Sequence, residues 1–296
     1  MKLFTSLINT IKEHFRLKLI ICFILCAILP LLILGTISYK ISYNIAKDKI
    51  LKETAISCEK NQHLLENRMT QIENLEDSIH FNLCMLCTTA ERPMSNYLDK
   101  LSAVRNNIAS IADSFNIYHV NIFLPDDSFA SKEGLTFCSL SDLKKYKVQL
   151  SDFSKQGLTP NWIFRKDINF PYMVSKGEEP SGVLSCYRYA KINSQKTCLA
   201  VHITSEELSN YLNTFSEGNP SLSYIINSEG VVLSSTDKKQ IGGSLSNEKL
   251  HAITQNLRLS HFSYDKCEII STPVHNQLFL VTETPDYYIR QSSSFL

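Results

Sequence analysis

The residues best suited to ligand chemistry lie in three stretches between residues 117 and 190, where aromatic and polar side chains interrupt mostly apolar surroundings. In the last stretch Ser185, Tyr187 and Tyr189 recur at every second position, which places them on one face of an extended strand. Small-molecule pockets combine aromatic walls with a few polar groups that orient the ligand. A packing role is the alternative for each residue, above all for the single tryptophan. The candidate ligand-binding residues are Tyr118, Asn121, Phe123, Trp162, Arg165, Tyr172, Ser185, Tyr187 and Tyr189.

The sequence motifs of nucleophilic and metal-dependent catalysis are missing. No G-x-S-x-G surrounds a serine, and the eight histidines form no H-E-x-x-H. Asp126 and Asp127 lack the alternating oxygen ligands of a calcium loop, so a polar turn is the better interpretation. We therefore predict no catalytic residues, no metal site, no cofactor and no enzymatic activity. An extracytoplasmic hydrolase is the least favoured alternative.

The nine cysteines leave the question of disulfides open. Cys84 and Cys87 form a C-x-x-C, but no second pair follows at zinc-ligand spacing, and two small buried residues are the simpler interpretation. Cys186 and Cys198 flank an expected hairpin turn, and a disulfide across that hairpin is a weaker possibility.

Charge and composition exclude one class of partner. The net charge of +1 and the isoelectric point of about 7.6 provide no basic surface for nucleic acid. Hydrophobic residues make up 44% of the chain and aromatic residues 10%, as in packed globular proteins. The sequence therefore predicts a folded protein that does not bind DNA or RNA.

Residues 19–37 form an uncharged, almost wholly apolar run that predicts a membrane helix. A helix of this length spans about 28 Å, close to the thickness of the hydrocarbon core of a bilayer. Pro30 lies inside the run, which a membrane helix tolerates. A cleaved signal peptide is the alternative, but its apolar region is shorter and a small-residue cleavage site follows it. Lys and Arg are equally frequent before and after the apolar run, so the positive-inside rule does not decide its orientation. We expect the N-terminus to be cytoplasmic because the leading tail is too short to fold, whereas a large domain region follows the run.

A second helical pattern follows directly. Residues 38–82, which we call the stalk helix, contain no glycine or proline and repeat apolar residues at steps of three, four and seven. The polar face, which includes Arg68, is expected to be solvated or to flank a homodimer interface. The residues of the apolar face are Ile41, Ile45, Cys58, Leu65, Met69, Ile72, Leu75 and Ile79.

The remainder predicts two small domains joined by a helix. A second helix over residues 97–115 precedes a strand that begins at Ile117. Residues 126–180 are expected to be irregular, and residues 181–204 form a hairpin. The last part predicts two strands around the turn Asn227 to Gly230, a helix over 247–256 and two more strands, the first of them HFSYDKCEIISTPV. The expected segments are a cytoplasmic tail 1–18, a transmembrane helix 19–37, the stalk helix 38–82, a membrane-distal domain 83–203, a linker helix 204–220, a membrane-proximal domain 221–288 and a C-terminal tail 289–296.

This layout, with a second domain that opens YIINSEGVVLSS, resembles the double Cache extracytoplasmic sensor region of bacterial receptors. It is most similar to the regions of Gram-positive sensor histidine kinases and of membrane-anchored AraC-type regulators, whose N-termini also combine a short basic tail, a Leu/Ile anchor and an exit like ISYKIS. The resemblance covers residues 18–285. It implies an α+β fold in which a transmembrane helix continues into the stalk helix and two PAS-like (Cache) antiparallel-sheet domains follow.

The resemblance also implies a function. The chain is expected to be the small-molecule-sensing region of a membrane receptor, with the ligand in the membrane-distal domain and the signal carried by the stalk helices. A membrane-anchored scaffold that binds a protein partner is the alternative. Amino-acid-sensing members use an arginine close to a tryptophan, but here Trp162 precedes Arg165, so that specificity is not carried over. Receptors of this kind continue into a second membrane helix and an output module, which this sequence lacks. A truncated receptor and a separate output partner are both consistent with it.

Overall fold

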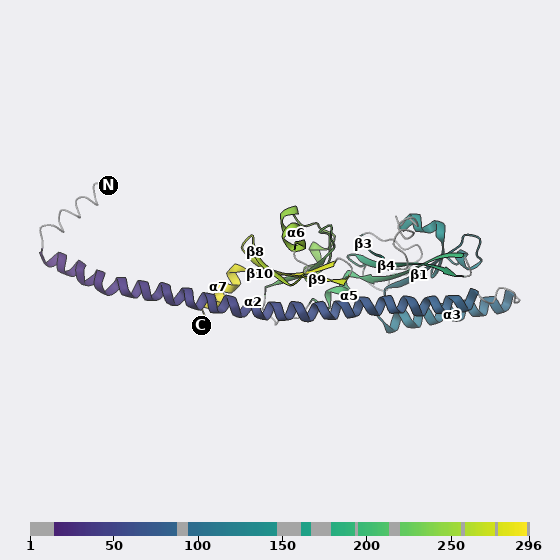
Figure 1. Ribbon diagram of the computed structural model, residues 1–296, viewed down its shortest axis with the longest axis horizontal. Coiled ribbons are helices and arrows are strands. Elements are labelled where there is room, and N and C mark those ends of the chain that lie inside the picture. The colour runs from purple at the N-terminus through teal and green to yellow at the C-terminus, as the bar shows by residue number, and fades with distance from the viewer. Residues whose placement is uncertain are drawn as a thin grey trace. The chain divides into compact units, whose positions relative to one another are not determined.

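The computed structural model describes residues 15–87, 94–146, 161–166, 179–192, 195–212, 220–255, 258–275 and 278–294 (Figure 1). The chain divides into two compact units, Met1–Glu53 with Pro285–Leu296, and Thr54–Thr284. The second unit contains two five-stranded sheets and the part of the long helix that follows Glu53. An N-terminal apolar helix followed by two largely antiparallel sheets confirms the predicted fold class. The predicted domain limits stay a prediction.

Helix α2 extends from Phe15 to Cys87 with Pro30 inside it, so the expected membrane helix and stalk helix are one element. Near its N-terminus it is long and apolar enough to cross a membrane, and no other helix among the described residues is. Its large apolar side chains there are exposed; Phe23, for example, is 71% exposed. A continuous exposed surface of this kind suits lipid and not water.

The part of α2 that belongs to the second unit buries one face against it. Cys58, Leu65, Met69, Ile72 and Ile79 are all at most 1% exposed, as their spacing predicts. Ile41 and Ile45, in the other unit, belong to the same apolar series but are 54% and 55% exposed. Periodicity identifies a helical face, but it does not indicate how much of that face is covered.

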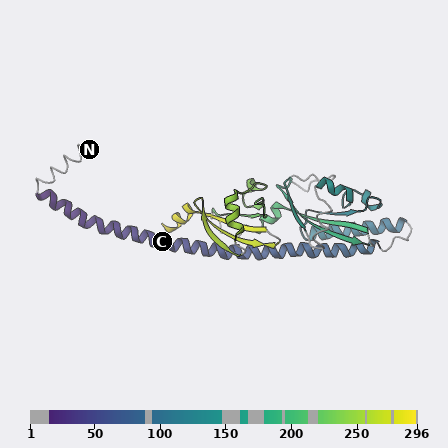
Figure 2. The ribbon, with the colours of Figure 1, turned by 45° about the horizontal axis from the view of Figure 1, so that its top comes forward.

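The first sheet has the strand order β2-β1-β5-β4-β3. All neighbours pair antiparallel except β1 and β2, which are parallel. Helix α3 (Met94–Ser114) lies beside α2 along one face of this sheet, in both views (Figures 1 and 2). The strands are β1 (His119–Leu124), β2 (Phe137–Ser139), β3 (Asn161–Arg165), β4 (Val183–Ile192) and β5 (Gln195–Thr204), and two short 3₁₀ helices, η1 (Ala130–Lys132) and η2 (Leu140–Tyr146), flank β2.

Helix α5 (Ser205–Ser209) follows β5 and links it to the second sheet. The Thr204 side chain caps it by accepting a hydrogen bond from the Glu207 amide, 3.1 Å away. Ser205 Oγ donates to the Leu233 carbonyl, and Ser234 Oγ donates to the Ser205 carbonyl, each at 2.6 Å. The helix ends earlier than expected, and residues 213–219 of the predicted linker lie outside the described residues.

The second sheet has the order β7-β6-β10-β9-β8. Its core packs Tyr224, Ile226, Ile269 and Val281 beneath helix α6, which contributes Ile253. The elements are β6 (Leu222–Ile226), β7 (Val232–Ser235), η3 (Lys238–Gln240), α6 (Asn247–Thr254), β8 (Ser260–Tyr264), β9 (Cys267–Val274) and β10 (Leu278–Pro285); α7 (Asp286–Ser293) belongs to the other unit.

Two predictions of local structure are wrong. The segment expected to be irregular contains β2 and β3, because their pairing with distant β1 and β4 stabilises strands that have no local signal. The sequence HFSYDKCEIISTPV forms the hairpin β8–β9 and not one strand, with its turn at Asp265 and Lys266. Neither turn residue is glycine, so the usual hairpin signal is absent.

We expect Lys266→Gly to stabilise the protein by about 0.5–1 kcal/mol. Asp265 and Lys266 have φ angles of 46° and 60°, the left-handed region that a two-residue hairpin turn requires and in which a Cβ is unfavourable. Chemical denaturation of both proteins gives the difference. Lys266→Ala is the control: because alanine keeps the Cβ, an equal gain from alanine would contradict the argument.

Candidate ligand-binding site

The register of the first sheet determines which candidate residues share a face. Asn121 lies opposite Ala200 and Phe123 opposite Cys198, while Ala200 and Cys198 in turn lie opposite Tyr187 and Tyr189. Residues directly opposite each other in an antiparallel pair project from the same side. We call this side the candidate face; its residues are His119, Asn121, Phe123, Asn161, Ile163, Arg165, Val183, Ser185, Tyr187, Tyr189, Cys198, Ala200, His202 and Thr204.

A buried hydrogen-bond chain crosses the candidate face from β4 to β1. His202 Nδ1 lies 2.7 Å from Ser185 Oγ, and His202 Nε2 lies 2.9 Å from Asn121 Oδ1. Because the amide oxygen of Asn121 only accepts, Nε2 carries the proton and Nδ1 accepts from the serine hydroxyl. Asn121 Nδ2 completes the chain by donating to the Leu135 carbonyl at 2.7 Å.

Burial keeps the His202 imidazole neutral. The side chain is fully buried, and desolvation lowers its pKa well below the usual value, with further lowering from the nearby His119 and Arg165. Serine, histidine and asparagine occur here in the hydrogen-bond order of a catalytic triad. However, Ser185 and His202 are both 0% exposed, so no substrate reaches the hydroxyl, and a histidine of low pKa is a weak base. The hydrogen-bond chain therefore has a structural role; we call its three side chains, Ser185, His202 and Asn121, the polar floor of the candidate face.

Arg165 and Tyr187 lie beside this floor. The positive charge of Arg165 acts on both Tyr187 and His202. Burial nevertheless raises the pKa of Tyr187 to about 12, so its phenol stays neutral. Arg165 Nε is buried and has no hydrogen-bond partner within the part of the chain that the structure describes. Arg165 as a whole is half-buried, and a guanidinium whose Nε is shielded from water favours an anionic group nearby, because the desolvation of that atom is otherwise uncompensated.

The other end of the candidate face is a packed core. Phe123, Tyr187 and Cys198 contact Cys138 on β2 and Leu143 on η2. Phe123 and Cys198 are fully buried. Desolvation raises the pKa of the Cys198 thiol, so it behaves as a small apolar group.

The structure therefore brings together six of the nine candidates, which is a placement and not a demonstration of binding. Trp162 projects from the opposite face of β3, and Tyr118 precedes β1 at the edge of a separate cavity. Tyr172 lies outside the described residues. The six on the candidate face are Asn121, Phe123, Arg165, Ser185, Tyr187 and Tyr189.

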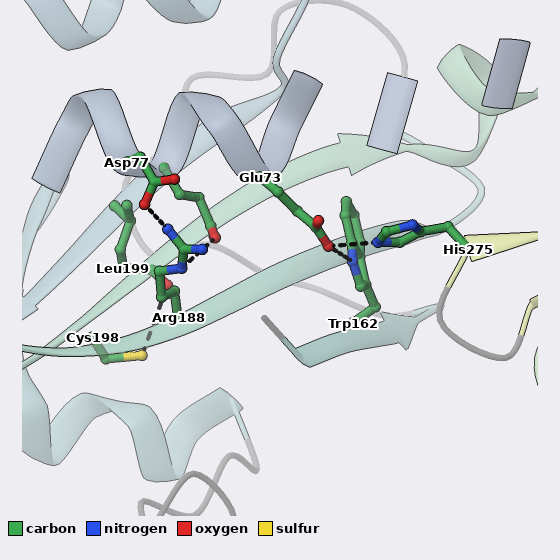
Figure 3. A network of polar contacts seen from close by, with 8 residues as sticks. Glu73, Asp77, Trp162, Arg188, Cys198, Leu199 and His275 are labelled. Carbon is green, nitrogen blue, oxygen red and sulfur yellow. Dashed lines mark hydrogen bonds and ion pairs between the residues drawn. The ribbon is translucent and has the colours of Figure 1, made fainter. Parts of the chain in front are cut away.

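The opposite face of the sheet contacts α2 through charged side chains (Figure 3). Arg188 on β4 donates to Asp77, and its Nε lies 3.8 Å from Glu76 Oε2. From the sequence, a charged residue on this outer strand face is expected to be in solvent, but the Arg188 side chain is only 19% exposed, so that expectation is wrong. Strand alternation places Arg188 opposite the candidate face, but it does not reveal that a helix covers that side.

The disulfide question is answered for the hairpin. Cys186 and Cys198 form no disulfide. Cys186 pairs in register with Val201 and Cys198 with Tyr189, so the two thiols project from opposite faces of the sheet. A hairpin disulfide needs directly opposed residues, and this register excludes it. The Cys87 side chain lies outside the described residues.

A cavity of about 340 Å³ opens where α3 ends and α5 begins. Three of its lining residues are acidic: Asp113, Glu206 and Glu207. Glu207 is engaged by Arg68 at 3.1 Å, and Glu206 Oε1 accepts from the Ser181 amide at 2.9 Å. Among the residues described, no group of three His, Cys, Asp or Glu side chains is placed to hold a metal ion.

Sequence reasoning missed His119 and His202, because it treats isolated histidines as surface or core residues. The available signal is the position of His202 in LAVHIT, where a polar residue shares a strand face with Ala200 and Cys198. A polar side chain at a fully buried strand position requires partners on neighbouring strands. Its partners Ser185 and Asn121 are both candidates from the sequence.

No protein-family model and no curated protein matches the chain. Solved structures do match. The periplasmic sensory domain of the Campylobacter jejuni chemoreceptor Tlp1 gives a TM-score of 0.60 at 14% identity, over 81% of this chain and 98% of that one. The extracellular domain of vpHK1S-Z8, named as a histidine kinase, gives 0.61 at 13% identity, over 83% and 98%. The ligand-binding domain of Campylobacter jejuni Tlp3 in complex with L-valine gives 0.54 at 14% identity, over 85% and 98%. The chain thus has the fold of these sensory domains.

Proposed function

We propose that this chain is the extracytoplasmic, small-molecule-sensing region of a single-pass membrane receptor, of the double Cache class. The observation that carries the proposal is the shared fold, which covers more than four fifths of this chain and nearly all of each sensory domain. The apolar start of α2 supports membrane anchoring. With the N-terminus in the cytoplasm, the two sheets lie outside the cell.

The ligand binds over the candidate face of the first sheet, at the end where Arg165, Tyr187 and the Ser185–His202–Asn121 floor meet. Arg165 provides a cation, whereas Tyr187 is 0% exposed and is part of the packed support and not of the ligand-contacting surface. The floor is already satisfied by internal hydrogen bonds, so it serves as a rigid support for Arg165. An arginine pairs best with a carboxylate. The ligand class that fits is a small carboxylate, and amino acids are the first compounds to test, since Tlp3 is solved with L-valine.

Signalling follows from linkage. A ligand changes the balance of two receptor conformations only by the difference in its affinity for them, typically 1–3 kcal/mol for coupled sites. Helix α2 is suited to carry that change because it packs against the sheets through a continuous face and extends into the apolar segment. A homodimer through the stalk helix would let two such helices move against each other.

A thermal-shift screen of the full chain in detergent tests this function. Amino acids, dicarboxylates, sugars and polyamines are added one at a time, and a true ligand at 100 times its Kd stabilises the folded state by about 2.7 kcal/mol. We expect a carboxylate to raise Tm. If no compound in any class does so, the sensor assignment fails and the scaffold alternative takes its place.

For the carboxylate found in this screen, we expect Arg165→Gln to weaken binding roughly 10- to 100-fold, since a charge-assisted hydrogen bond contributes about 1.5–3 kcal/mol. Calorimetric titration measures the change. Arg105→Gln is the matched control, because Arg105 lies on exposed α3 surface, 3.8 Å from Glu133, and should bind as the wild type does. Equal affinities of wild type and Arg165→Gln would place the ligand elsewhere.

A further inference from the structure

One carboxylate oxygen on α2 accepts hydrogen bonds from both sheets (Figure 3). Glu73 Oε1 lies 3.1 Å from Trp162 Nε1 and 2.8 Å from His275 Nε2. The indole N–H only donates, so the tryptophan contact has a single possible direction. The side chains of Glu73 and His275 are 17% and 26% exposed, so the contacts form in a largely water-free layer.

The two donors come from distant parts of the chain. Trp162 is in β3 of the first sheet, and His275 directly follows β9 of the second. Thr272, also in β9, donates to Gln62 Oε1 on α2 at 2.8 Å. The end of β9 is therefore attached to α2 at two places, and the second of them is Glu73.

Strand β3 is the element most sensitive to such an attachment. It has five residues, lies at the edge of the sheet formed by the described strands, and among those strands pairs only with β4. An edge strand with one neighbour opens more readily than a central strand. Its two faces differ: Arg165 and Ile163 belong to the candidate face, whereas Trp162 points toward α2.

We propose that Glu73 is a positioning residue that couples the second sheet to strand β3, and through β3 to Arg165. When His275 and Trp162 share the Glu73 oxygen, the end of β9 holds the carboxylate in the orientation that secures β3. Loss of His275 frees the Glu73 side chain to move, and β3 becomes less ordered. Because linkage is reciprocal, a ligand that orders β3 also strengthens the attachment of the second sheet to α2. This last consequence rests on the proposed function, whereas the coupling itself does not.

Hydrogen exchange measured by mass spectrometry on the full chain without ligand tests the coupling. We expect His275→Ala to speed exchange of the β3 amides, which are about 110 residues away in sequence, roughly fivefold to tenfold, as loss of one net hydrogen bond implies. Fluorescence of Trp162, the single tryptophan, should shift in the same variant. His261→Ala is the matched control, because His261 is also in the second sheet and pairs with a glutamate, Glu268, at 2.6 Å, but that pair does not involve α2.

A double variant distinguishes coupling through Glu73 from a general loss of stability in the second sheet. In Glu73→Leu the shared acceptor is gone, so β3 exchanges fast already and adding His275→Ala should change it no further. Three results would overturn the proposal: unchanged β3 exchange in His275→Ala, an equal effect of His261→Ala, or a full His275→Ala effect in the Glu73→Leu background. If exchange changes as expected but no compound raises Tm in the thermal screen, the coupling proposal stands and the sensor proposal fails. If a compound raises Tm but β3 exchange is unchanged in His275→Ala, the sensor proposal stands and the coupling proposal fails.

Discussion

Replacing Arg68 with methionine lowers the free energy of unfolding by about 3–5 kcal/mol, which is the usual cost of removing one partner of a buried ion pair. Arg68 is on α2 and only 6% exposed. Its Nη2 lies 3.1 Å from Glu207 Oε1 and donates to the Phe115 carbonyl at 2.5 Å. Without the guanidinium, Glu207 remains as a largely buried charge that has lost its cationic partner and keeps only neutral hydrogen-bond partners among the described residues, such as Asn116 and Tyr211. The same substitution also detaches α2 from the end of α3 and from α5.

Chemical denaturation of the full chain measures this loss. Arg105→Met is the matched control: it removes the same group from an exposed pair with Glu133 at 3.8 Å, and exposed pairs contribute only about 0–1 kcal/mol. A loss in Arg68→Met that does not exceed the control would show that water replaces the guanidinium at Glu207. The sequence analysis assigns Arg68 to the solvated face of the stalk helix, so this prediction depends wholly on the structure.

The stability of the protein should fall as pH rises from about 4.5 to about 8, and Glu76 should be the largest single cause. Glu76 is fully buried, and desolvation raises its pKa from 4.5 to about 8, against smaller opposing effects of Arg188 and the Cys186 thiol. The folded state therefore keeps a proton in this interval that the unfolded state has already released. Stability decreases with pH wherever the folded state binds more protons. Across the interval the loss attributable to Glu76 is on the order of 4 kcal/mol.

Glu76→Gln isolates this contribution, because the amide has nearly the same shape and carries no charge. We expect the variant to have a flatter stability profile between pH 5 and 8 and to be more stable than the wild type at pH 8.5. Arg188 keeps Asp77 as its partner in the variant. Glu59→Gln, on the exposed face of the same helix, should reproduce the wild-type profile. If Glu76→Gln is instead less stable than the wild type at pH 8.5, the ionised Glu76–Arg188 pair stabilises the fold and our sign is wrong.

Several elements could be predicted from local sequence. The spacing of Cys58, Leu65, Met69, Ile72 and Ile79 correctly indicates the face that α2 buries. The hairpin β4–β5 and the threonine cap of α5 likewise have local signals. Each of these depends on residues that lie within one or two turns, or one strand length, of each other.

Elements stabilised by distant partners could not be predicted. Strand β3 exists because β4 pairs with it, and the β8–β9 turn has Lys266 at the position where an Asp-Gly hairpin turn would have glycine. Burial of Arg68 and Arg188 shows the same limit, because a helical or strand pattern indicates which way a side chain points and not what it meets.

The candidate face also has features that the sequence could predict and features that it could not. Alternation alone grouped Asn121 with Phe123, and Ser185 with Tyr187 and Tyr189. It could not join the two groups, which requires β5 between them and His202 to bridge Ser185 to Asn121. Nor did the sequence separate Trp162 from Arg165, because the segment is expected to be irregular; pairing with β4 makes it a strand, in which residues three apart face opposite sides.

By itself, the sequence determined the apolar segment that is long enough to cross a membrane, the helical face that is buried and the succession of two sheets, because each follows from polarity and period along the chain. The tertiary structure alone decided which charges are buried. Glu76, Glu73 and Arg68 lie on a helix that also displays many solvated charges, and only the sheets, α3 and α5 packed against it select these three. Desolvation is a property of the surroundings and not of the residue, so the features that carry our predictions exist only in the folded protein.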